Sequence, residues 1–172
     1  NDASTSTTLL KFAELEGGSW ARGRKIFRSE AAGCFKCHSI GAGGARIGPD
    51  LMNLIHRDYA SLIRDISNPS FAINPDYIGH VVALNDGRVL TGVLTTDGDQ
   101  LLLGDEKGLV TKLEKSDIET MAVSRTSVMP VGIAQKLTAD QMKDLLTYLM
   151  TLPPHMPLES PLTAPPLRTQ AE

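Results

Sequence analysis

The segment Cys34-Phe35-Lys36-Cys37-His38 constrains this chain more than any other part of its sequence. It holds both cysteines of the 172-residue chain, and a histidine follows the second one directly. This order is the attachment signature of c-type haem, because each thiol adds to one vinyl group of the porphyrin and the adjacent imidazole binds the iron. The sequence therefore predicts one covalent haem, held by Cys34 and Cys37, with His38 as an axial ligand.

Three other kinds of site use some of the same residues. A thioredoxin-like redox pair is expected between a strand and a helix, whereas a helical segment precedes this motif and a glycine-rich loop follows it. A zinc site would need a fourth ligand beside the motif, for which His56 and His80 are the candidates. A disulfide between the cysteines would leave the adjacent histidine without a role. The haem interpretation accounts for the whole motif.

Composition and charge narrow the range of functions. A hydrophobic content of 41% in 172 residues suits one compact domain, or one domain with an insertion. The net charge of −3 indicates neither nucleic acid nor an anionic membrane surface as a partner, and no stretch is long and apolar enough to span a membrane. No basic segment followed by an apolar run opens the sequence, so we expect any signal peptide to be absent or already removed.

Hydrophobic periodicity predicts three helices. The first runs over residues 19–30 with Ser19 as its N-cap, and the second over 58–67, where Asn68-Pro69 ends it. The third runs from a capping box at Thr138 to about residue 152. Its apolar face comprises Met142, Leu145, Leu146, Leu149 and Leu152.

Between the second and third helices, residues 78–123 have the period and turn chemistry of short strands. The dipeptides Asp86-Gly87 and Asp97-Gly98 are typical of tight hairpin turns. We expect five strands that curl into a small barrel or a strongly bent sheet. They are predicted at residues 78–84, 89–95, 100–103, 109–113 and 118–123.

The second axial ligand of the predicted haem is sought among the methionines and the remaining histidines. Met129 lies in a loop and precedes Pro130, which keeps the chain extended and outside a helix. It is the predicted ligand, with His80 as the alternative. His56 is expected at the surface, with a contact to a haem propionate as its alternative role. Met156 falls in the Pro-rich tail. The other methionines are expected to pack in the interior: Met52, Met121, Met142 and Met150.

Pro49 completes the predicted cofactor-binding set. A metal-bound histidine usually donates its second ring N–H to a carbonyl or carboxylate oxygen. The Pro49 carbonyl is predicted to accept that hydrogen bond from His38. The alternative is an ordinary loop proline after Gly48.

Taken together, these residues resemble the class I cytochromes c. The match comprises a first helix, the motif, the Gly48-Pro49-Asp50-Leu51 loop, a methionine loop and a last helix. In that family a glycine and an aromatic residue of the first helix cross a leucine and tyrosine pair of the last. The resemblance implies this crossing here for Gly23 and Phe27 with Leu145 and Tyr148.

Ordinary class I cytochromes lack the β-rich stretch. The order of the elements and motifs along the whole chain instead resembles that of the haem-binding domain family of planctomycete and verrucomicrobial multidomain proteins. The resemblance to this family covers roughly residues 18–152. It rests on four motifs: Gly23-Arg24-Lys25-Ile26-Phe27, Asn68-Pro69-Ser70, Asp86-Gly87-Arg88 and Ser127-Val128-Met129-Pro130. The opening hairpin of the β-rich stretch also resembles that of an Sm-like barrel.

The resemblance implies a mainly α cytochrome c fold with an inserted small antiparallel β domain, α+β overall. We expect residues 18–77 and 124–152 to form the haem domain and residues 78–123 the insert. A disordered lead-in over residues 1–17 and a Pro-rich tail or linker over residues 153–172 complete the expected organisation.

The function implied is that of a monohaem c-type cytochrome that carries single electrons between redox partners and is not an enzyme. Its partners would be redox proteins or a fused dehydrogenase domain, and haem attachment would place it in the periplasm or elsewhere outside the cytoplasm. The insert would dock a partner or shield a haem edge. A haem-based sensor or gas-binding module with a displaceable distal ligand is the alternative, and a peroxidase would need His80 as its acid–base group.

Overall fold

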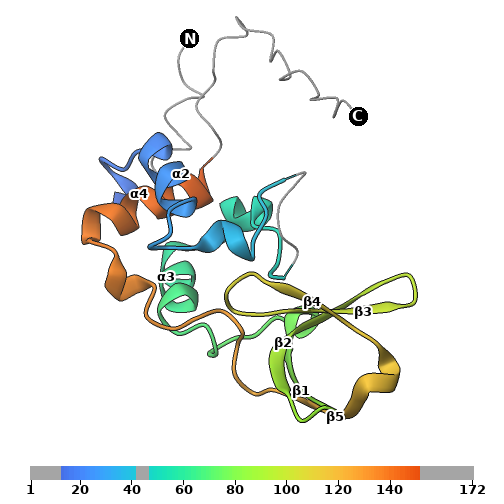
Figure 1. Ribbon diagram of the computed structural model, residues 1–172. Helices are drawn as coiled ribbons and strands as arrows, with labels where there is room; N and C mark the ends of the chain where they lie inside the picture. Colours follow the sequence, from blue (N-terminus) through green and yellow to red (C-terminus); the bar gives the residue numbers. More distant parts are fainter. Residues whose placement is uncertain (1–12, 42–46, 152–172) are drawn as a thin grey trace, which may run out of the picture.

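The computed structural model describes residues 13–41 and 47–151 (Figure 1). These residues form three α-helices and a five-stranded antiparallel sheet, which confirms the predicted α+β class. Figure 1 shows the helices gathered at one end of the molecule and the sheet at the other. The tail predicted over 153–172 and the first twelve residues of the lead-in lie outside the described residues.

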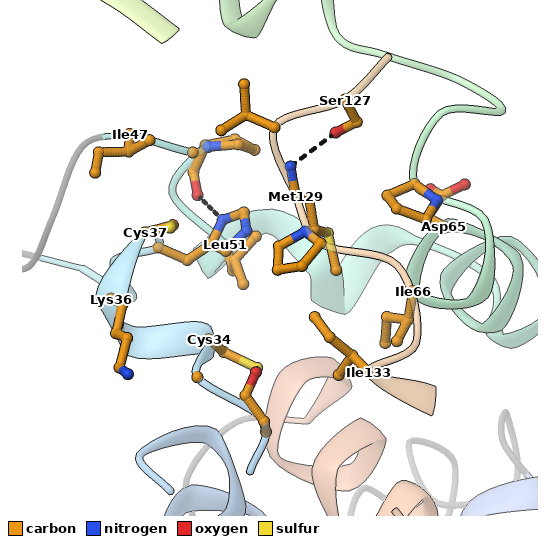
Figure 2. A pocket seen from close by; sticks show the side chains of 18 of the residues that line it. Cys34, Lys36, Cys37, Ile47, Leu51, Asp65, Ile66, Ser127, Met129 and Ile133 are labelled. Carbon is orange, nitrogen blue, oxygen red and sulfur yellow. Dashed lines mark hydrogen bonds between the residues drawn. The ribbon is translucent and has the colours of Figure 1, made fainter. Parts of the chain in front are cut away.

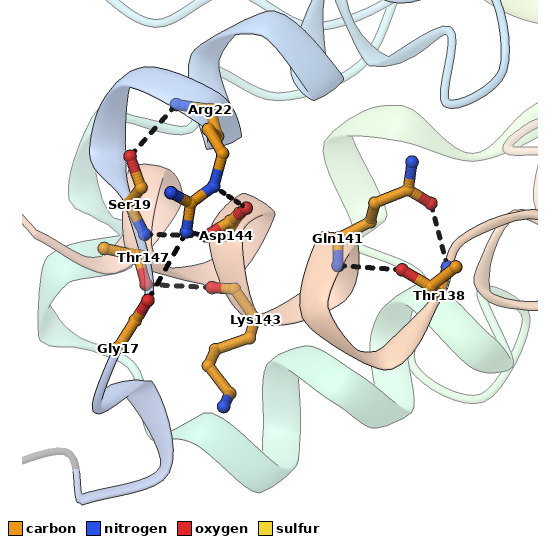
Figure 3. Close-up of polar contacts among 8 residues, drawn as sticks. All are labelled: Gly17, Ser19, Arg22, Thr138, Gln141, Lys143, Asp144 and Thr147. Carbon is orange, nitrogen blue, oxygen red and sulfur yellow. Dashed lines mark hydrogen bonds and ion pairs between the residues drawn. The ribbon is translucent and has the colours of Figure 1, made fainter.

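The three helices begin at the residues that the sequence predicts. They are α2 (Trp20–Phe27), α3 (Tyr59–Ser67) and α4 (Ala139–Met150). The hydroxyl of Ser19 accepts a hydrogen bond from the Arg22 amide at the start of α2, and the Asp58 side chain caps α3 in the same way. Thr138 and Gln141 form the predicted capping box of α4 (Figure 3).

Helix α2 ends earlier than expected, at Phe27 rather than near Glu30. The Ser29 hydroxyl donates a hydrogen bond of 2.7 Å to the Ile26 carbonyl, which satisfies one of the free carbonyls at the helix end. The chain then turns at Gly33, whose φ of 63° is readily adopted only by glycine. The polar side chain near the helix end thus shortens the helix by one turn.

All five predicted strands are present. They are β1 (Gly79–Leu84), β2 (Val89–Asp97), β3 (Gln100–Gly104), β4 (Val110–Leu113) and β5 (Ile118–Val123). The strand order is β4-β3-β2-β1-β5, so β5 returns to pair with β1. Because β4 and β5 form the two edges of this sheet, the insert is an open sheet rather than the closed barrel that was one of the expectations.

The helical part and the sheet have separate hydrophobic cores. The helical core draws residues from α2, α3, α4 and the segment before α4, whereas the sheet core consists of Val82, Leu84, Leu103 and Leu113. Leu15 belongs to the helical core, at 8% exposed, and lies in the 3-10 turn Ala13–Leu15. Residues 13–17 were expected in a disordered lead-in, and this expectation is wrong for Leu15, because its apolar side chain is buried by the helices.

Helices α2 and α4 cross in close contact at the position of Gly23. A Cβ atom there would overlap the backbone carbonyl of Asp144, so only glycine allows this approach. One turn further along, the rings of Phe27 and Tyr148 are 5.5 Å apart, and Leu145 is 1% exposed. The predicted contact between these two pairs of residues is confirmed.

A buried carboxylate, which was not predicted from the sequence, fixes the same crossing. Asp144 accepts hydrogen bonds from the Ser19 amide at 2.7 Å and from the Arg22 guanidinium at 2.6 and 2.9 Å (Figure 3). The Asp144 side chain is 6% exposed. The Arg22 guanidinium is the main reason why the pKa of the Asp144 carboxyl lies below its ordinary value.

We predict that Gly23→Ala lowers the free energy of unfolding by about 1–3 kcal/mol, the usual cost of overpacking a tight contact. Alanine favours the helical backbone by up to about 1 kcal/mol over glycine, but the overlap with Asp144 outweighs this gain. Urea unfolding followed by the fluorescence of Trp20, the single tryptophan, measures the change. Lys25→Ala, at an exposed position of α2, is the control and should be nearly neutral; equal effects would contradict the close crossing.

We also predict that Asp144→Asn destabilises the protein by about 1.5–3 kcal/mol at neutral pH, since it removes hydrogen bonds to a charged group. Because the folded pKa of Asp144 is lowered, its contribution is complete above the unfolded pKa of about 3.9 and is lost as the pH falls through the folded pKa. The difference in unfolding free energy between wild type and variant should therefore shrink at acidic pH. Exposed Asp140 is the control: Asp140→Asn should cost only about 0.3–1 kcal/mol.

Candidate cofactor pocket

All five predicted site residues line one cavity of about 560 Å³. Figure 2 shows Cys34 and Cys37 on the motif turn and Met129 on a separate segment of the chain. His38 and Pro49 also face this cavity. Its volume lies in the range of small-molecule and cofactor sites, about 300–1,000 Å³. The fold thus brings together residues from before and after the sheet.

The motif is folded as a short turn that presents its three reactive side chains to the cavity. Gly33, with its positive φ, precedes the 3-10 helix Cys34–Lys36. The amide of His38 donates a hydrogen bond of 2.9 Å to the Cys34 carbonyl, which closes the turn. The two cysteines are not joined by a disulfide in this structure.

The hydrogen bond predicted between His38 and Pro49 is present. The Nδ1 atom of His38 lies 2.9 Å from the Pro49 carbonyl oxygen. A carbonyl only accepts, so Nδ1 carries the proton and the lone pair of Nε2 is available to a ligand. Burial lowers the pKa of His38, which favours the neutral imidazole that metals bind.

Backbone contacts hold the Pro49 segment against the motif. The Gly48 amide donates a hydrogen bond of 2.8 Å to the Cys37 carbonyl, and the Leu51 amide one of 2.9 Å to the Ser39 carbonyl. A Cβ atom at Gly48 would lie 2.5 Å from Cε1 of His38, so the imidazole rests directly on the glycine backbone. The orientation of the imidazole is therefore fixed from two sides.

The pKa values of both thiols are raised. Burial raises the pKa of Cys34 to about 11, and burial together with the nearby Asp105 carboxylate raises the pKa of Cys37. A thioredoxin-like pair depends instead on a cysteine of lowered pKa. The electrostatics of this pair therefore disfavour the thiol–disulfide alternative.

Met129 is held in its loop by two serine side chains. Its amide donates a hydrogen bond of 3.2 Å to the Ser127 hydroxyl, as drawn in Figure 2. The Ser127 amide in turn donates one of 3.1 Å to the hydroxyl of Ser70, just after α3. Half-buried Met129 packs against the helical core. The link between Ser70 and Ser127 escaped the sequence analysis because nothing in the sequence pairs two serines so far apart.

The other methionines and histidines lie in different environments. Met142 and Met150 are buried, as predicted, and His56 is exposed. Interior packing was expected for Met52 and Met121, and this is wrong, because their side chains are 57% and 52% exposed. Met121 lies on edge strand β5, where no further strand covers it, and Met52 begins a short 3-10 helix at the surface. Met156 lies outside the described residues.

His80, the alternative ligand, lies on β1 and does not line the cavity. Its Nδ1 atom is buried without a hydrogen-bond partner among the described residues. Within those residues, no group of three or more His, Cys, Asp or Glu side chains is arranged to hold a metal ion. The fourth ligand that a zinc site at the motif requires is thus not found in the described part of the chain.

Sequence reasoning missed the part of the cavity wall that the sheet supplies. Val93 of β2 and the turn residues Glu106 and Lys107, between β3 and β4, line the cavity. The strands predicted at residues 100–103 and 109–113 imply a connection between them, but nothing in the sequence indicates what this connection contacts.

No protein-family model matches the chain, and a search of curated proteins gives no match either. In the described residues, no helix is both long enough and apolar enough to cross a membrane.

Proposed function

We propose that this chain is a monohaem c-type cytochrome domain that carries one electron at a time between redox partners. This proposal rests on one observation: the Cys34–His38 motif and Met129 line the same cavity. In the sequence the motif precedes the five strands, and Met129 follows them. In this proposal Cys34 and Cys37 would attach the haem, and His38 and Met129 would bind its iron.

The residues around the cavity fit such a group. The two cysteines and the imidazole line one cavity, and Nε2 of His38 keeps its lone pair because Nδ1 is bonded to Pro49. The thioether of Met129 would be the second donor, a ligand that electron-carrying haem proteins combine with histidine. When bound, the haem supplies the one-electron chemistry of its iron. Much of the wall is aliphatic, including Ile47, Leu51, Leu54, Leu62, Ile66, Ile133, Leu145 and Leu149.

Each neighbouring residue has a defined task in this proposal. The Pro49 carbonyl fixes the tautomer and orientation of His38 and increases its basicity as a ligand. Ser127 and Ser70 restrain the loop so that Met129 stays on its side of the cavity. The aliphatic wall excludes water, and a methionine ligand together with a dry site raises the reduction potential.

The fold that we propose for the helical part is that of the class I cytochromes c, which the crossing of α2 and α4 at Gly23 supports. The sheet is then an insertion between the two ligating regions of that fold. We further propose that the partners are redox proteins or a fused dehydrogenase domain. Since covalent haem attachment takes place outside the cytoplasm, the proposal places the mature chain in the periplasm or an equivalent compartment.

We predict that the protein produced with a haem-attachment system retains its haem through denaturation and acidic organic extraction. Its alkaline pyridine haemochrome should have the spectrum of a haem with two thioether bonds. Cys34→Ser should shift that spectrum toward that of a haem with one remaining vinyl group, and the double variant with Cys37→Ser should release the haem. Complete extraction of the haem from the wild type would contradict covalent attachment.

We predict that Met129→Ala abolishes the weak red absorption band of a methionine bound to ferric iron and opens the ferrous iron to carbon monoxide. Met52→Ala, which removes an exposed methionine, is the matched control and should leave the band unchanged. A band that survives Met129→Ala would remove this residue from the ligand set. Rapid binding of carbon monoxide to the ferrous wild type would instead favour the sensor alternative.

A further inference from the structure

The turn between β3 and β4 lies against the haem-attachment motif. At its start, Gly104 packs on the buried side chain of Ile47, and a Cβ atom at Gly104 would overlap it. At its end, Gly108 adopts a φ of 85°, and a Cβ atom there would lie 2.8 Å from Cβ and 2.9 Å from the carbonyl oxygen of Lys36. The backbone of the turn therefore rests on the motif itself.

The turn is also internally fixed. The Asp105 carboxylate accepts hydrogen bonds from the amides of Lys107 at 2.9 Å and Leu109 at 2.8 Å. The Gly108 amide donates a further bond of 3.1 Å to the Asp105 carbonyl. These internal hydrogen bonds hold the turn in one conformation.

The side of the motif that the turn covers is that of Cys37. The Cys37 sulfur lies 4.0 Å from the Asp105 carbonyl oxygen, and the next two residues, Glu106 and Lys107, line the cavity. The turn thus closes the cavity at the second attachment cysteine.

We propose that the turn of residues 105–108 covers the haem edge at the Cys37 thioether, excludes water from it and thereby raises the reduction potential; this inference rests on the proposed function. Ferric haem carries one more positive charge than ferrous haem, so water stabilises the ferric form and its exclusion favours the ferrous form. The opposite charges of Glu106 and Lys107 largely cancel. The Asp105 carboxylate would by itself lower the potential, but hydrogen bonds from the Lys107 and Leu109 amides partly offset its charge, so the exclusion of water is proposed to dominate.

Gly108→Ala tests the inference, with Gly98→Ala as a matched control. Both glycines lie in hairpin turns of the same sheet with a positive φ, but a Cβ atom at Gly98 meets nothing within 4 Å. In the haem-loaded protein, spectroelectrochemical titration should give a lower reduction potential for Gly108→Ala and the wild-type value for Gly98→Ala. Equal potentials for Gly108→Ala and wild type would overturn the inference.

Charge variants provide a second test that does not depend on how the turn tolerates alanine. Glu106→Gln should raise the reduction potential and Lys107→Gln should lower it, and both shifts should shrink as salt is added. Exposed Glu119 on β5 is the control, and Glu119→Gln should leave the potential unchanged. If neither turn variant shifts the potential, the turn does not adjoin the haem. The pyridine haemochrome and the methionine band, recorded on the same samples, report separately whether the proposed function itself fails.

Discussion

The site depends on the backbone contact between the motif and the Gly48–Pro49 segment. One hydrogen bond joins the Gly48 amide to the Cys37 carbonyl, and a second joins Nδ1 of His38 to the Pro49 carbonyl. The missing side chain at Gly48 lets the imidazole lie directly against this segment. These contacts decide which nitrogen of His38 carries a proton, and therefore which one is free to bind. The ligand role proposed for His38 follows from that choice.

The helices and the sheet both support the cavity around this contact. The crossing of α2 and α4, fixed by Gly23 and the buried Asp144, forms the core on which the cavity rests. The sheet reaches back to the motif through the turn at Gly108 and through Gly104, which packs on Ile47 beside Gly48. The sheet, whose strands lie between α3 and α4 in the sequence, is therefore part of the pocket wall.

Local signals in the sequence predicted most of the fold. Capping residues such as Ser19, Asp58 and Thr138 locate the helix starts, because each satisfies amides of its own first turn. Hairpin turns locate the strands in a similar way, because the turn residues themselves determine where the flanking strands begin and end. The hydrogen bond from His38 to Pro49 was also predictable, since the chemistry of a ligating histidine demands such an acceptor. What escaped prediction depends on contacts between distant segments: the buried pair of Arg22 and Asp144, the exposure of Met121, and the position of the Asp105 turn.

In the proposed function, Met129 completes a ligand set that begins at His38. Proton and carbon NMR of the reduced protein, labelled at the methionine methyl groups, tests it directly, because a methyl bound at the iron lies in the shielding cone of the porphyrin. If Met129 binds the iron, one of the six methionine methyl signals lies far upfield and is lost in Met129→Leu. Six signals at ordinary positions, or an upfield signal that persists in that variant, would contradict it.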